Sequence, residues 1–289
     1  MFCIHCGKEI KDQTKYCTEC GVENFVAKAT KKRRFLNKKS FFVFLGVITF
    51  VIISVFLYSL KEPVVTKSLD IEIASSVVNI YCDNGTDEGT SGGSGTIMTE
   101  DGLVLTNAHI IPETVNEDTA ITCMVILPDP TTGAPSEIYQ AYPIVLPEIS
   151  EKYDLAFVQI DDVFVDDEGT VYGDYPKIFP AYDDMKYCKS GNVILGEPIK
   201  IYGYPAISGR YALTITDGIV SSLLADEGLI ITSAKISHGN SGGLAVDQYG
   251  CRIGIPSMVN SDENESLGVI ISNNLISDFT DEVNKILKK

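Results

Sequence analysis

The chain has 289 residues, 45% of them hydrophobic, and a formal net charge of −16 at pH 7. Charge is spread unevenly: residues 1–60 hold ten Lys or Arg against four Asp or Glu, and residues 61–289 hold 13 against 35. The C-terminal part is therefore strongly acidic and repels phosphate backbones, so we expect it to be a poor nucleic-acid binder. The length suffices for one large domain or two of ordinary size.

Residues 1–24 contain two CxxC pairs, each of which can direct two thiolates at one ion. Two such pairs complete a tetrahedral site of four sulfur ligands that suits Zn²⁺. The segment "CIHCGKEIKDQTKYCTECG" resembles the short zinc ribbons at the start of many bacterial membrane proteins. His5 lies within the first pair, but four cysteines already fill the coordination shell. We therefore predict a structural zinc ribbon with the ligands Cys3, Cys6, Cys17 and Cys20.

A basic linker over residues 25–40 leads into an uncharged run over residues 41–60. As a helix, 20 residues span about 30 Å, which is the thickness of the hydrocarbon core of a bilayer. Seven basic residues between Lys28 and Ser40 precede this run. Basic flanks stay on the cytoplasmic side. We predict a single-pass protein of the cell membrane with a cytoplasmic N-terminus and an extracytoplasmic C-terminal part.

A second linker, residues 61–69, is followed by a predominantly β pattern over residues 70–289. Short runs rich in Val, Ile, Leu and Tyr are separated by turn residues and predict many strands, among them residues 75–82, 102–108, 121–128, 154–160, 192–205, 228–236 and 267–272. A terminal helix is predicted from the helical spacing of Leu275, Phe279, Val283, Ile286 and Leu287. This pattern favours an all-β fold of barrels or a sandwich with one C-terminal helix.

The segment "SHGNSGG" surrounds Ser241 with glycines and suggests a nucleophile approached by backbone amides. A serine hydroxyl needs a base, and a carboxylate must orient that base. His238 is too close in sequence to reach the hydroxyl easily, so His109, at the end of an apolar strand, is the candidate base. Asp154, at the start of another strand, is the candidate orienting carboxylate; Asp161 and Asp162 compete from the far end of that strand.

Five segments resemble segments of the HtrA/Deg-type trypsin-like serine proteases, and they follow one another in the same order as in those proteases. They are "SGGSGTIMTEDGLVLTNAHII", "YDLAFVQI", "LTITDGIVSSL", "TSAKISHGNSGGLAVDQYGCRIGI" and "LGVIISNNLI". The resemblance implies two six-stranded barrels with a cleft between them, and a triad of His109, Asp154 and Ser241. It further implies an oxyanion hole formed by the backbone N–H groups of Gly239 and Ser241.

The sequence also differs from these proteases in some features. Relatives of this type usually carry PDZ domains after the protease, whereas the chain ends one predicted helix later. Digestive members of the superfamily are activated by a new N-terminus that pairs with an aspartate beside the serine; Asn240 occupies that position here, which argues against zymogen cleavage. No acidic residue lies near the expected primary pocket, at residues 235–238 and 256–258, to attract Arg or Lys.

These patterns predict a membrane-anchored serine endopeptidase that needs no cofactor for catalysis and acts on envelope or extracytoplasmic proteins. A catalytically idle protease-fold sensor that signals through the zinc ribbon to a cytoplasmic partner is the alternative. A zinc-ribbon nucleic-acid protein would leave the triad unexplained. The resemblance leaves room for a homo-oligomer, and the remaining four cysteines allow three pairings, which the sequence leaves open: Cys82, Cys123, Cys188 and Cys251.

Overall fold

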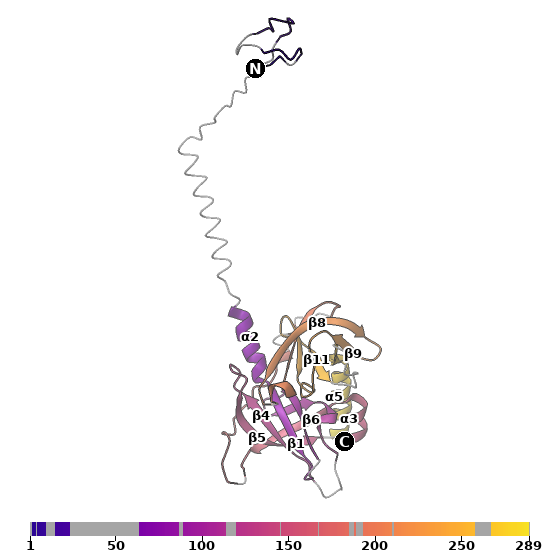
Figure 1. Cartoon of the computed structure of the whole chain (residues 1–289). Coiled ribbons are helices and arrows are strands. Elements are labelled where there is room, and N and C mark those ends of the chain that lie inside the picture. Colours follow the sequence, from indigo (N-terminus) through magenta and orange to yellow (C-terminus); the bar gives the residue numbers. More distant parts are fainter. Residues whose placement is uncertain are drawn as a thin grey trace. The chain divides into compact units, whose positions relative to one another are not determined.

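The computed structural model comprises two compact units, Met1–Glu62 and Pro63–Lys289 (Figure 1). The structure describes residues 2–3, 5–9, 15–23, 64–86, 89–113, 120–144, 146–166, 168–184, 188, 193–209, 211–257 and 267–288. The predicted basic linker (25–40) and transmembrane helix (41–60) lie outside these residues. Of the helices that the structure describes, none has the length and apolar character needed to cross a bilayer.

The second unit contains two closed antiparallel barrels, as the resemblance implies. In the first barrel the strand order is β1-β2-β3-β6-β5-β4. Side chains alternate in β1, so that Val78, Ile80 and Cys82 are buried in the barrel core while Tyr81 faces outward. The strands are β1 (Val77–Asp83), β2 (Thr90–Ile97), β3 (Leu103–Thr106), β4 (Thr122–Pro128), β5 (Pro135–Ile144) and β6 (Ala156–Val163).

The second barrel has the order β10-β11-β12-β9-β8-β7. Its core is built from β-branched and small side chains, including Ile201, Val220 and Ile270, which fit a narrow pleated interior. The strands are β7 (Pro198–Gly203), β8 (Thr214–Leu224), β9 (Leu229–Thr232), β10 (Leu244–Asp247), β11 (Arg252–Ser257) and β12 (Gly268–Ser272). The first barrel precedes the second along the chain, so the fold is two consecutive modules.

The predicted C-terminal helix is α5 (Asn273–Leu287), and it packs with α3 (Pro147–Tyr153) over a third apolar cluster. Phe279 and Val283 are buried as the spacing predicts, and Ile276 is buried with them. Ile286 and Leu287 are exposed, because the last turn of the helix extends beyond the residues it packs on.

A helix outside the predicted set, α2 (Val64–Ser75), leads directly into β1. Leu69 and Ile73 pack on an apolar cluster that includes Tyr202, Tyr204, Leu244 and Val246 of the second barrel. The Asp70 carboxylate accepts two hydrogen bonds of 2.7 Å from Lys200 Nζ and one of 2.5 Å from the Tyr202 hydroxyl. Burial raises the pKa of Tyr202, which therefore stays a hydrogen-bond donor to this carboxylate. α2 is thus fixed onto the second barrel.

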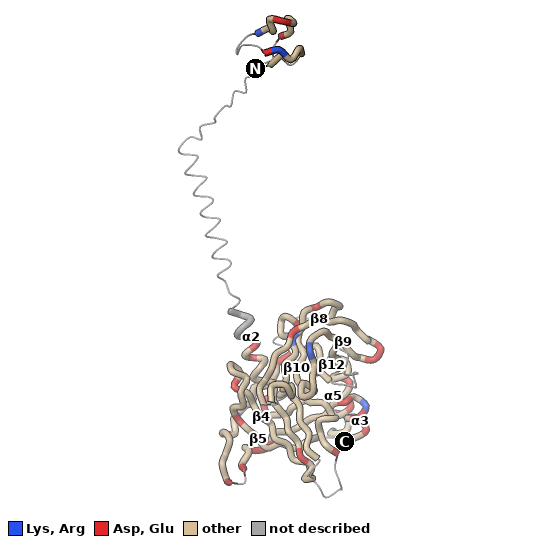
Figure 2. Tube along the Cα trace, in the orientation of Figure 1, with Lys and Arg blue, Asp and Glu red and all other residues tan. Residues whose placement is uncertain are grey.

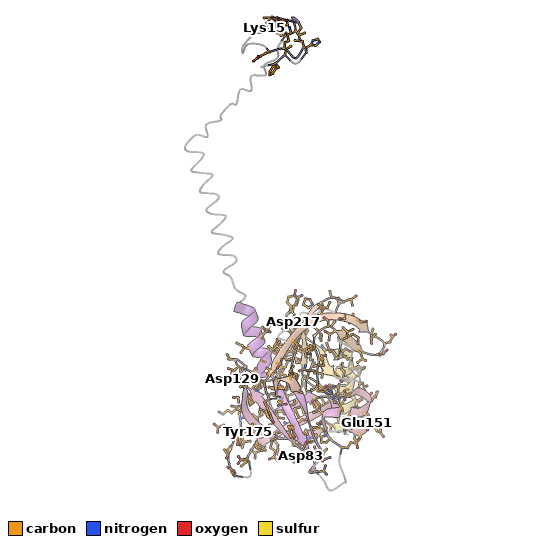
Figure 3. All side chains as sticks on the ribbon, in the orientation of Figure 1. Lys15, Asp83, Asp129, Glu151, Tyr175 and Asp217 are labelled. Carbon is orange, nitrogen blue, oxygen red and sulfur yellow. A yellow bond between two sulfur atoms is a disulfide. The ribbon has the colours of Figure 1, made fainter. Side chains whose placement is uncertain are left out.

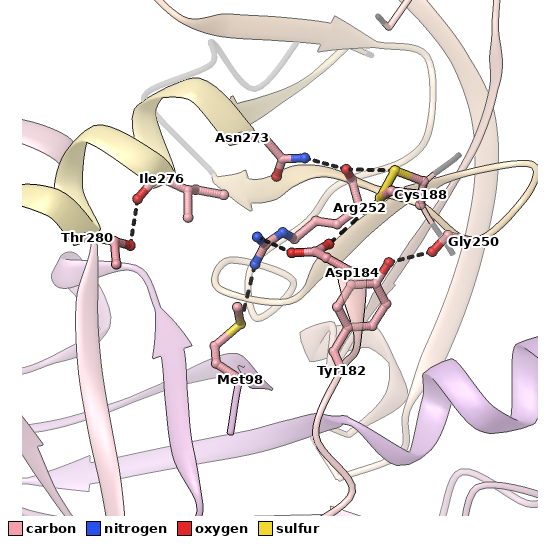
Figure 4. Close-up of polar contacts among 10 residues, drawn as sticks. Met98, Tyr182, Asp184, Cys188, Gly250, Arg252, Asn273, Ile276 and Thr280 are labelled. Atoms are coloured by element: carbon pink, nitrogen blue, oxygen red, sulfur yellow. Dashed lines mark hydrogen bonds and ion pairs between the residues drawn. A yellow bond between two sulfur atoms is a disulfide. The ribbon is translucent and has the colours of Figure 1, made fainter. Parts of the chain in front are cut away.

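The connection between the barrels is anchored to the second barrel by a polar cluster (Figure 4). Asp184 accepts from Arg252 Nη2 at 2.5 Å, and the Tyr182 hydroxyl donates to the carbonyl of Gly250. Burial raises the pKa of Asp184, and the Arg252 guanidinium opposes that shift. A disulfide joins Cys188 to Cys251 beside these contacts. The connection between the barrels is therefore held to the second barrel at one place, by an ion pair, a hydrogen bond and a disulfide.

A second disulfide joins Cys82 of β1 to Cys123 of β4, which face each other in register across the seam where the first barrel closes. Of the three pairings open to the four cysteines, the structure therefore has Cys82–Cys123 and Cys188–Cys251. Disulfides of this kind persist in oxidising compartments.

Acidic side chains predominate along the traced chain of the second unit (Figure 2). Exposed carboxylates occur on both barrels, for example Asp129 after β4 and Asp217 on β8 (Figure 3). The prediction that this part binds nucleic acid poorly stays a prediction, and its physical basis is the excess of acidic over basic residues.

Candidate active site

The ring of His109 and the carboxylate of Asp154 form a close pair. Nδ1 of His109 lies 2.9 Å from both carboxylate oxygens, and the backbone N–H of His109 donates to Oδ1 at 3.1 Å. Nδ1–H is then the donor to the carboxylate, which leaves Nε2 as the ring nitrogen that can accept a proton. The pair comes from two elements of the first barrel: His109 lies in the turn η1 (Ala108–Ile110) after β3, and Asp154 lies just before β6.

Local structure aims the Asp154 carboxylate at this ring. Asp154 follows the last residue of α3 in the left-handed conformation, with φ of 52°, the only positive φ among the described residues that are not glycine. Asn107 Nδ2 donates to its carbonyl at 2.8 Å and to Oδ2 at 3.1 Å. Ser257 Oγ, from β11 of the other barrel, donates to Oδ2 at 2.9 Å. The carboxylate is thus oriented from both barrels.

The loop that carries Ser241 begins at Ser237 and runs into β10. Gly242, with φ of +83°, has no room for a side chain, since a β-carbon there would lie 2.1 Å from the Ser94 carbonyl oxygen and 2.3 Å from Thr106 Oγ1. The carbonyl of Ser241 accepts from the backbone N–H of Ser94 at 2.8 Å. Ser241 is buried, and its loop packs against β2 and β3, at the same end of the first barrel as His109.

The peptide between His238 and Gly239 has a defined orientation. The His238 carbonyl accepts from the backbone N–H of Ala206 at 2.7 Å. In a trans peptide the C=O and the following N–H point in opposite directions, so the Gly239 N–H is directed away from Ala206. Gly239 has φ of +96°, and a β-carbon there would lie 2.2 Å from the Tyr204 carbonyl oxygen. Only glycine can therefore hold this amide as the structure has it.

The side chain of Ser94 connects this loop to the first barrel. Its hydroxyl donates to the Gly239 carbonyl at 2.6 Å and accepts from the Tyr204 N–H at 2.9 Å. Thr106 Oγ1 donates to the Ser94 carbonyl at 2.7 Å. All polar groups of this fully buried serine are satisfied by groups from both barrels. Ser94 therefore fixes the carbonyl side of the Gly239–Asn240 peptide.

The structure brings the residues predicted for catalysis to the junction of the barrels. The side chain of His238 is exposed, and it is the backbone carbonyl of this residue that is engaged. Asn240 is buried, with its amide 3.5 Å from the Lys235 carbonyl. Of the expected primary pocket, Met258 lies outside the described residues. The sequence did not lead us to Asn107, Ser257 and Ser94. The feature that could have identified them is a polar residue within an apolar strand or at the end of one.

In the first unit, the four cysteines predicted to bind zinc lie together. Their sulfur atoms all fall within 4.8 Å of one another, with Cys3 to Cys20 at 3.6 Å and Cys6 to Cys17 at 3.7 Å. A tetrahedron with bonds of about 2.3 Å to zinc has sulfur–sulfur edges of about 3.8 Å, so the arrangement fits. These four cysteines could hold a metal ion.

The two halves of this site have the same backbone design. Gly7 donates to the Cys3 carbonyl and Gly21 to the Cys17 carbonyl, both at 2.9 Å. Both glycines have positive φ, of 71° and 73°, which closes each turn beneath its pair of sulfurs. Backbone hydrogen bonds from Cys6 and His5 lower the pKa of the Cys3 thiol to about 6. The pKa of Cys20 is raised to about 12, because a lowering backbone hydrogen bond from Val22 is outweighed by burial and by hydrogen bonds with the other three sulfurs.

Two six-stranded antiparallel barrels, a His–Asp pair on the first and a glycine-flanked serine on the second define the class of trypsin-like serine peptidases. The family model described as "Trypsin-like peptidase domain" matches residues 93–255, more than half of the chain, and the chain belongs to this family. The match covers His109, Asp154 and Ser241.

Among curated proteins, similar chains include "Serine protease HTRA2, mitochondrial" of Drosophila virilis, 29% identical over 180 residues. That alignment covers 58% of this chain and 34% of the relative. "Serine protease HTRA4" of Mus musculus is 30% identical over 179 residues, covering 58% of this chain and 30% of the relative. The chain therefore aligns with about a third of the length of these relatives.

Among solved structures, the serine endoprotease from Yersinia pestis superposes with a TM-score of 0.55 at 24% identity. It covers 77% of this chain and 67% of that one. This likeness supports the fold. The predicted similarity to HtrA-like protease domains is confirmed by the curated relatives together with the family match.

Proposed function

We propose that this chain hydrolyses peptide bonds in proteins through a His109–Asp154–Ser241 triad and an acyl-enzyme. The observation that carries the proposal is the His109–Asp154 pair, with Nδ1 at 2.9 Å from the carboxylate, at the barrel junction against which the Ser241 loop packs. His109 acts through Nε2 as general base toward the Ser241 hydroxyl and then as general acid toward the leaving amine. Asp154 keeps the ring in the required tautomer and stabilises the imidazolium.

The backbone N–H groups of Gly239 and Ser241 are the proposed oxyanion donors. Support comes from the Ala206–His238 hydrogen bond, which turns the Gly239 N–H away from the second barrel. Donors that are already oriented stabilise the charge of the tetrahedral intermediate without reorganising during the reaction. No cofactor takes part in this chemistry.

The test is reactivity of Ser241 with a fluorophosphonate probe together with cleavage of unfolded casein by the purified full-length chain. Wild type should be labelled and should cleave casein, and Ser241→Ala should do neither. A chain that is neither labelled nor active, yet binds unfolded protein, would establish the alternative of an idle sensor module.

We further propose that the Cys3, Cys6, Cys17 and Cys20 site holds one structural zinc ion. The sulfur spacing of 3.6–3.7 Å supports this. A unit this small buries too little apolar surface to fold unaided, so a metal ion would supply much of its folding free energy. The ribbon has a proposed cytoplasmic partner of unknown identity.

For localisation we propose a single-pass protein of the cell membrane, with the ribbon inside and the peptidase outside. Support comes from the cysteines: two disulfides lie in the second unit, whereas the four cysteines of the first are unpaired. The basic run from Lys28 to Lys39 gives the same orientation. Substrates are then envelope or extracytoplasmic proteins, and a homo-oligomer is compatible with this arrangement.

Orientation can be tested on intact spheroplasts. A bulky external protease should degrade the part after residue 60 and spare the ribbon. Labelling of Cys3 or Cys6 by an impermeant thiol reagent in intact spheroplasts would reverse the topology.

A further inference from the structure

A pocket of about 250 Å³ lies directly beside the oxyanion loop, on the outer face of the first barrel. An engineered protein cavity of about 150 Å³ accepts benzene, so this volume accepts one bulky side chain. Residues from both barrels line it, among them Tyr81, Gly92, Met124, Ile126, Tyr211 and Gly239.

The strand register explains why a hollow forms here. Tyr81 of β1 faces Gly92 of β2 on one side and Met124 of β4 on the other. Since alternate residues of β1 point into the barrel, Tyr81 and its two register neighbours belong to the outer face. Gly92 contributes no side chain to that face, and the ring of Tyr81 lies close against it: a β-carbon at Gly92 would be 3.2 Å from Tyr81 Cδ2. Tyr211, from the loop before β8, forms part of the opposite wall.

The position of the pocket indicates which half of the substrate, before or after the scissile bond, would reach it. Gly93 also lines the pocket, and a β-carbon at Gly93 would lie 2.5 Å from Ile110, next to His109, and 3.1 Å from the Ser241 carbonyl oxygen. His109 is the group that protonates the leaving amine, so the leaving half of the substrate lies on the first-barrel side of Ser241. The expected primary pocket, at residues 235–238 and 256–258, contributes no described residue to this one.

We infer that this pocket is a specificity subsite that binds a large apolar side chain, such as Leu, Met or Phe, one or two residues after the scissile bond. Of the described residues that line it, none is charged. Aromatic rings and a methionine form much of the wall, and such surfaces bind aliphatic and aromatic groups by apolar burial and sulfur–aromatic contact. The inference rests on the proposed peptidase function for its direction along the substrate.

The experiment is a digest of a proteome-derived peptide library by the full-length chain, with the cleavage products identified by mass spectrometry. Leu, Met, Phe and Tyr should be enriched at the first or second position after the cut. Met124→Lys should reduce that enrichment roughly tenfold and favour Asp or Glu there instead, because it places a cation in the pocket. Tyr211→Ala should weaken the preference without altering the preference before the cut. An apolar pocket discriminates by about 10–200-fold per methylene at most.

A matched control is Tyr142→Ala, since Tyr142 is an exposed tyrosine on β5 that does not line the pocket. It should leave the preference intact. Absence of enrichment in wild type, or enrichment that survives both pocket variants, would overturn the inference while leaving peptidase activity standing.

A binding measurement separates this inference from the proposed function. Two fluorescent peptides that differ only in having Leu or Asp at the first or second position after the scissile bond are titrated with the Ser241→Ala variant. This binding measurement does not depend on catalysis. Leu should bind about tenfold more tightly, and Met124→Lys introduced into Ser241→Ala should remove the difference. If the wild type cleaves no substrate and the Leu peptide still binds more tightly than the Asp peptide, the pocket is a peptide-binding site. The peptidase proposal then fails, and the pocket inference stands. Equal binding of both peptides would overturn the pocket inference.

Discussion

The hydroxyl of Ser94 donates a 2.6 Å hydrogen bond to the carbonyl of Gly239, 145 residues further along the chain. This bond crosses from the first barrel to the loop that carries the proposed oxyanion donors. Through it, β2 of the first barrel holds a loop of the second barrel in place.

Ser94→Ala should lower kcat by about 10–100-fold with little change in KM. Loss of one oxyanion donor costs about 10²–10³ in kcat. Ser94→Ala keeps the Gly239 N–H but removes a hydrogen bond that holds its residue in place, so a smaller loss is expected. It also leaves two buried groups without a partner, which should cost about 1–3 kcal/mol of stability. Steady-state kinetics and urea unfolding measure the two effects. Ser91→Ala, near the start of β2, is the control, and an equal kcat loss in that variant would refute the role of Ser94.

Variants of the proposed triad should behave as one unit. Ser241→Ala and His109→Ala should each lower kcat by about 10⁴–10⁶, and the double variant should lose little more. Asp154→Asn should cost about 10⁴, because the ring then adopts the wrong tautomer. Single-turnover kinetics on a fluorogenic peptide measure these losses. Retention of activity by His109→Ala together with its loss in His238→Ala would show that the base is misassigned.

The members of the proposed triad could be named from the sequence because each lies in a segment with a recognisable local pattern, and the triad as a whole stays a prediction. The interactions that orient it could not be named in this way. Ser257 reaches Asp154 across 103 residues of sequence, and that contact exists only once the two barrels have packed. The left-handed conformation of Asp154 likewise depends on α3, a seven-residue helix too short to produce a clear period in the sequence.

Most strands follow from their alternating or continuous apolar runs, but the β2 segment "TSGGSGTI" has three glycines and little strand propensity. Its place in the barrel is decided by pairing with β1 and by the close approach of the Ser241 loop. α2 was missed for a related reason, since Leu69 and Ile73 are buried by residues far away in the sequence, mostly of the second barrel. Tertiary packing, in both cases, outweighs the local signal.

The contact between α2 and the second barrel should contribute measurably to stability. Asp70→Asn removes the charge that accepts from Lys200 and Tyr202, and should lower the free energy of unfolding by about 1–2 kcal/mol, a figure reduced for partial solvent exposure. Denaturant unfolding followed by tyrosine fluorescence measures it. Asp278→Asn, on the exposed face of α5, is the comparison, and equal stability of the two variants would show that the Asp70 cluster contributes nothing.

The first unit should bind one zinc ion with four sulfur ligands at about 2.3 Å, as X-ray absorption on the full-length chain would report. His5→Ala should leave this spectrum unchanged, and Cys6→Ser should weaken binding strongly. A nitrogen in the shell of wild type that is lost in His5→Ala would replace the all-cysteine assignment. Removal of zinc with a chelator should leave casein cleavage unaffected, because the proposed triad lies in the other unit.

The Cys82–Cys123 disulfide should stabilise the first barrel by about 4 kcal/mol, the chain-entropy value for a loop of this length. The Cys82→Ala/Cys123→Ala variant should show that loss in denaturant unfolding. Under strong reductant this variant and wild type should differ far less. A difference that persists after full reduction would assign the loss to side-chain packing and not to the cross-link.

Each disulfide encloses one part of the proposed catalytic machinery: residues 82–123 contain His109, and residues 188–251 contain Ser241. Together the two cross-links contribute stabilisation comparable to the whole net stability of an ordinary domain. A newly made copy in a reducing cytosol would hold neither bridge and would populate the folded barrels poorly. On the proposed extracytoplasmic location, export and formation of the active fold would coincide, because both cross-links form only in an oxidising compartment.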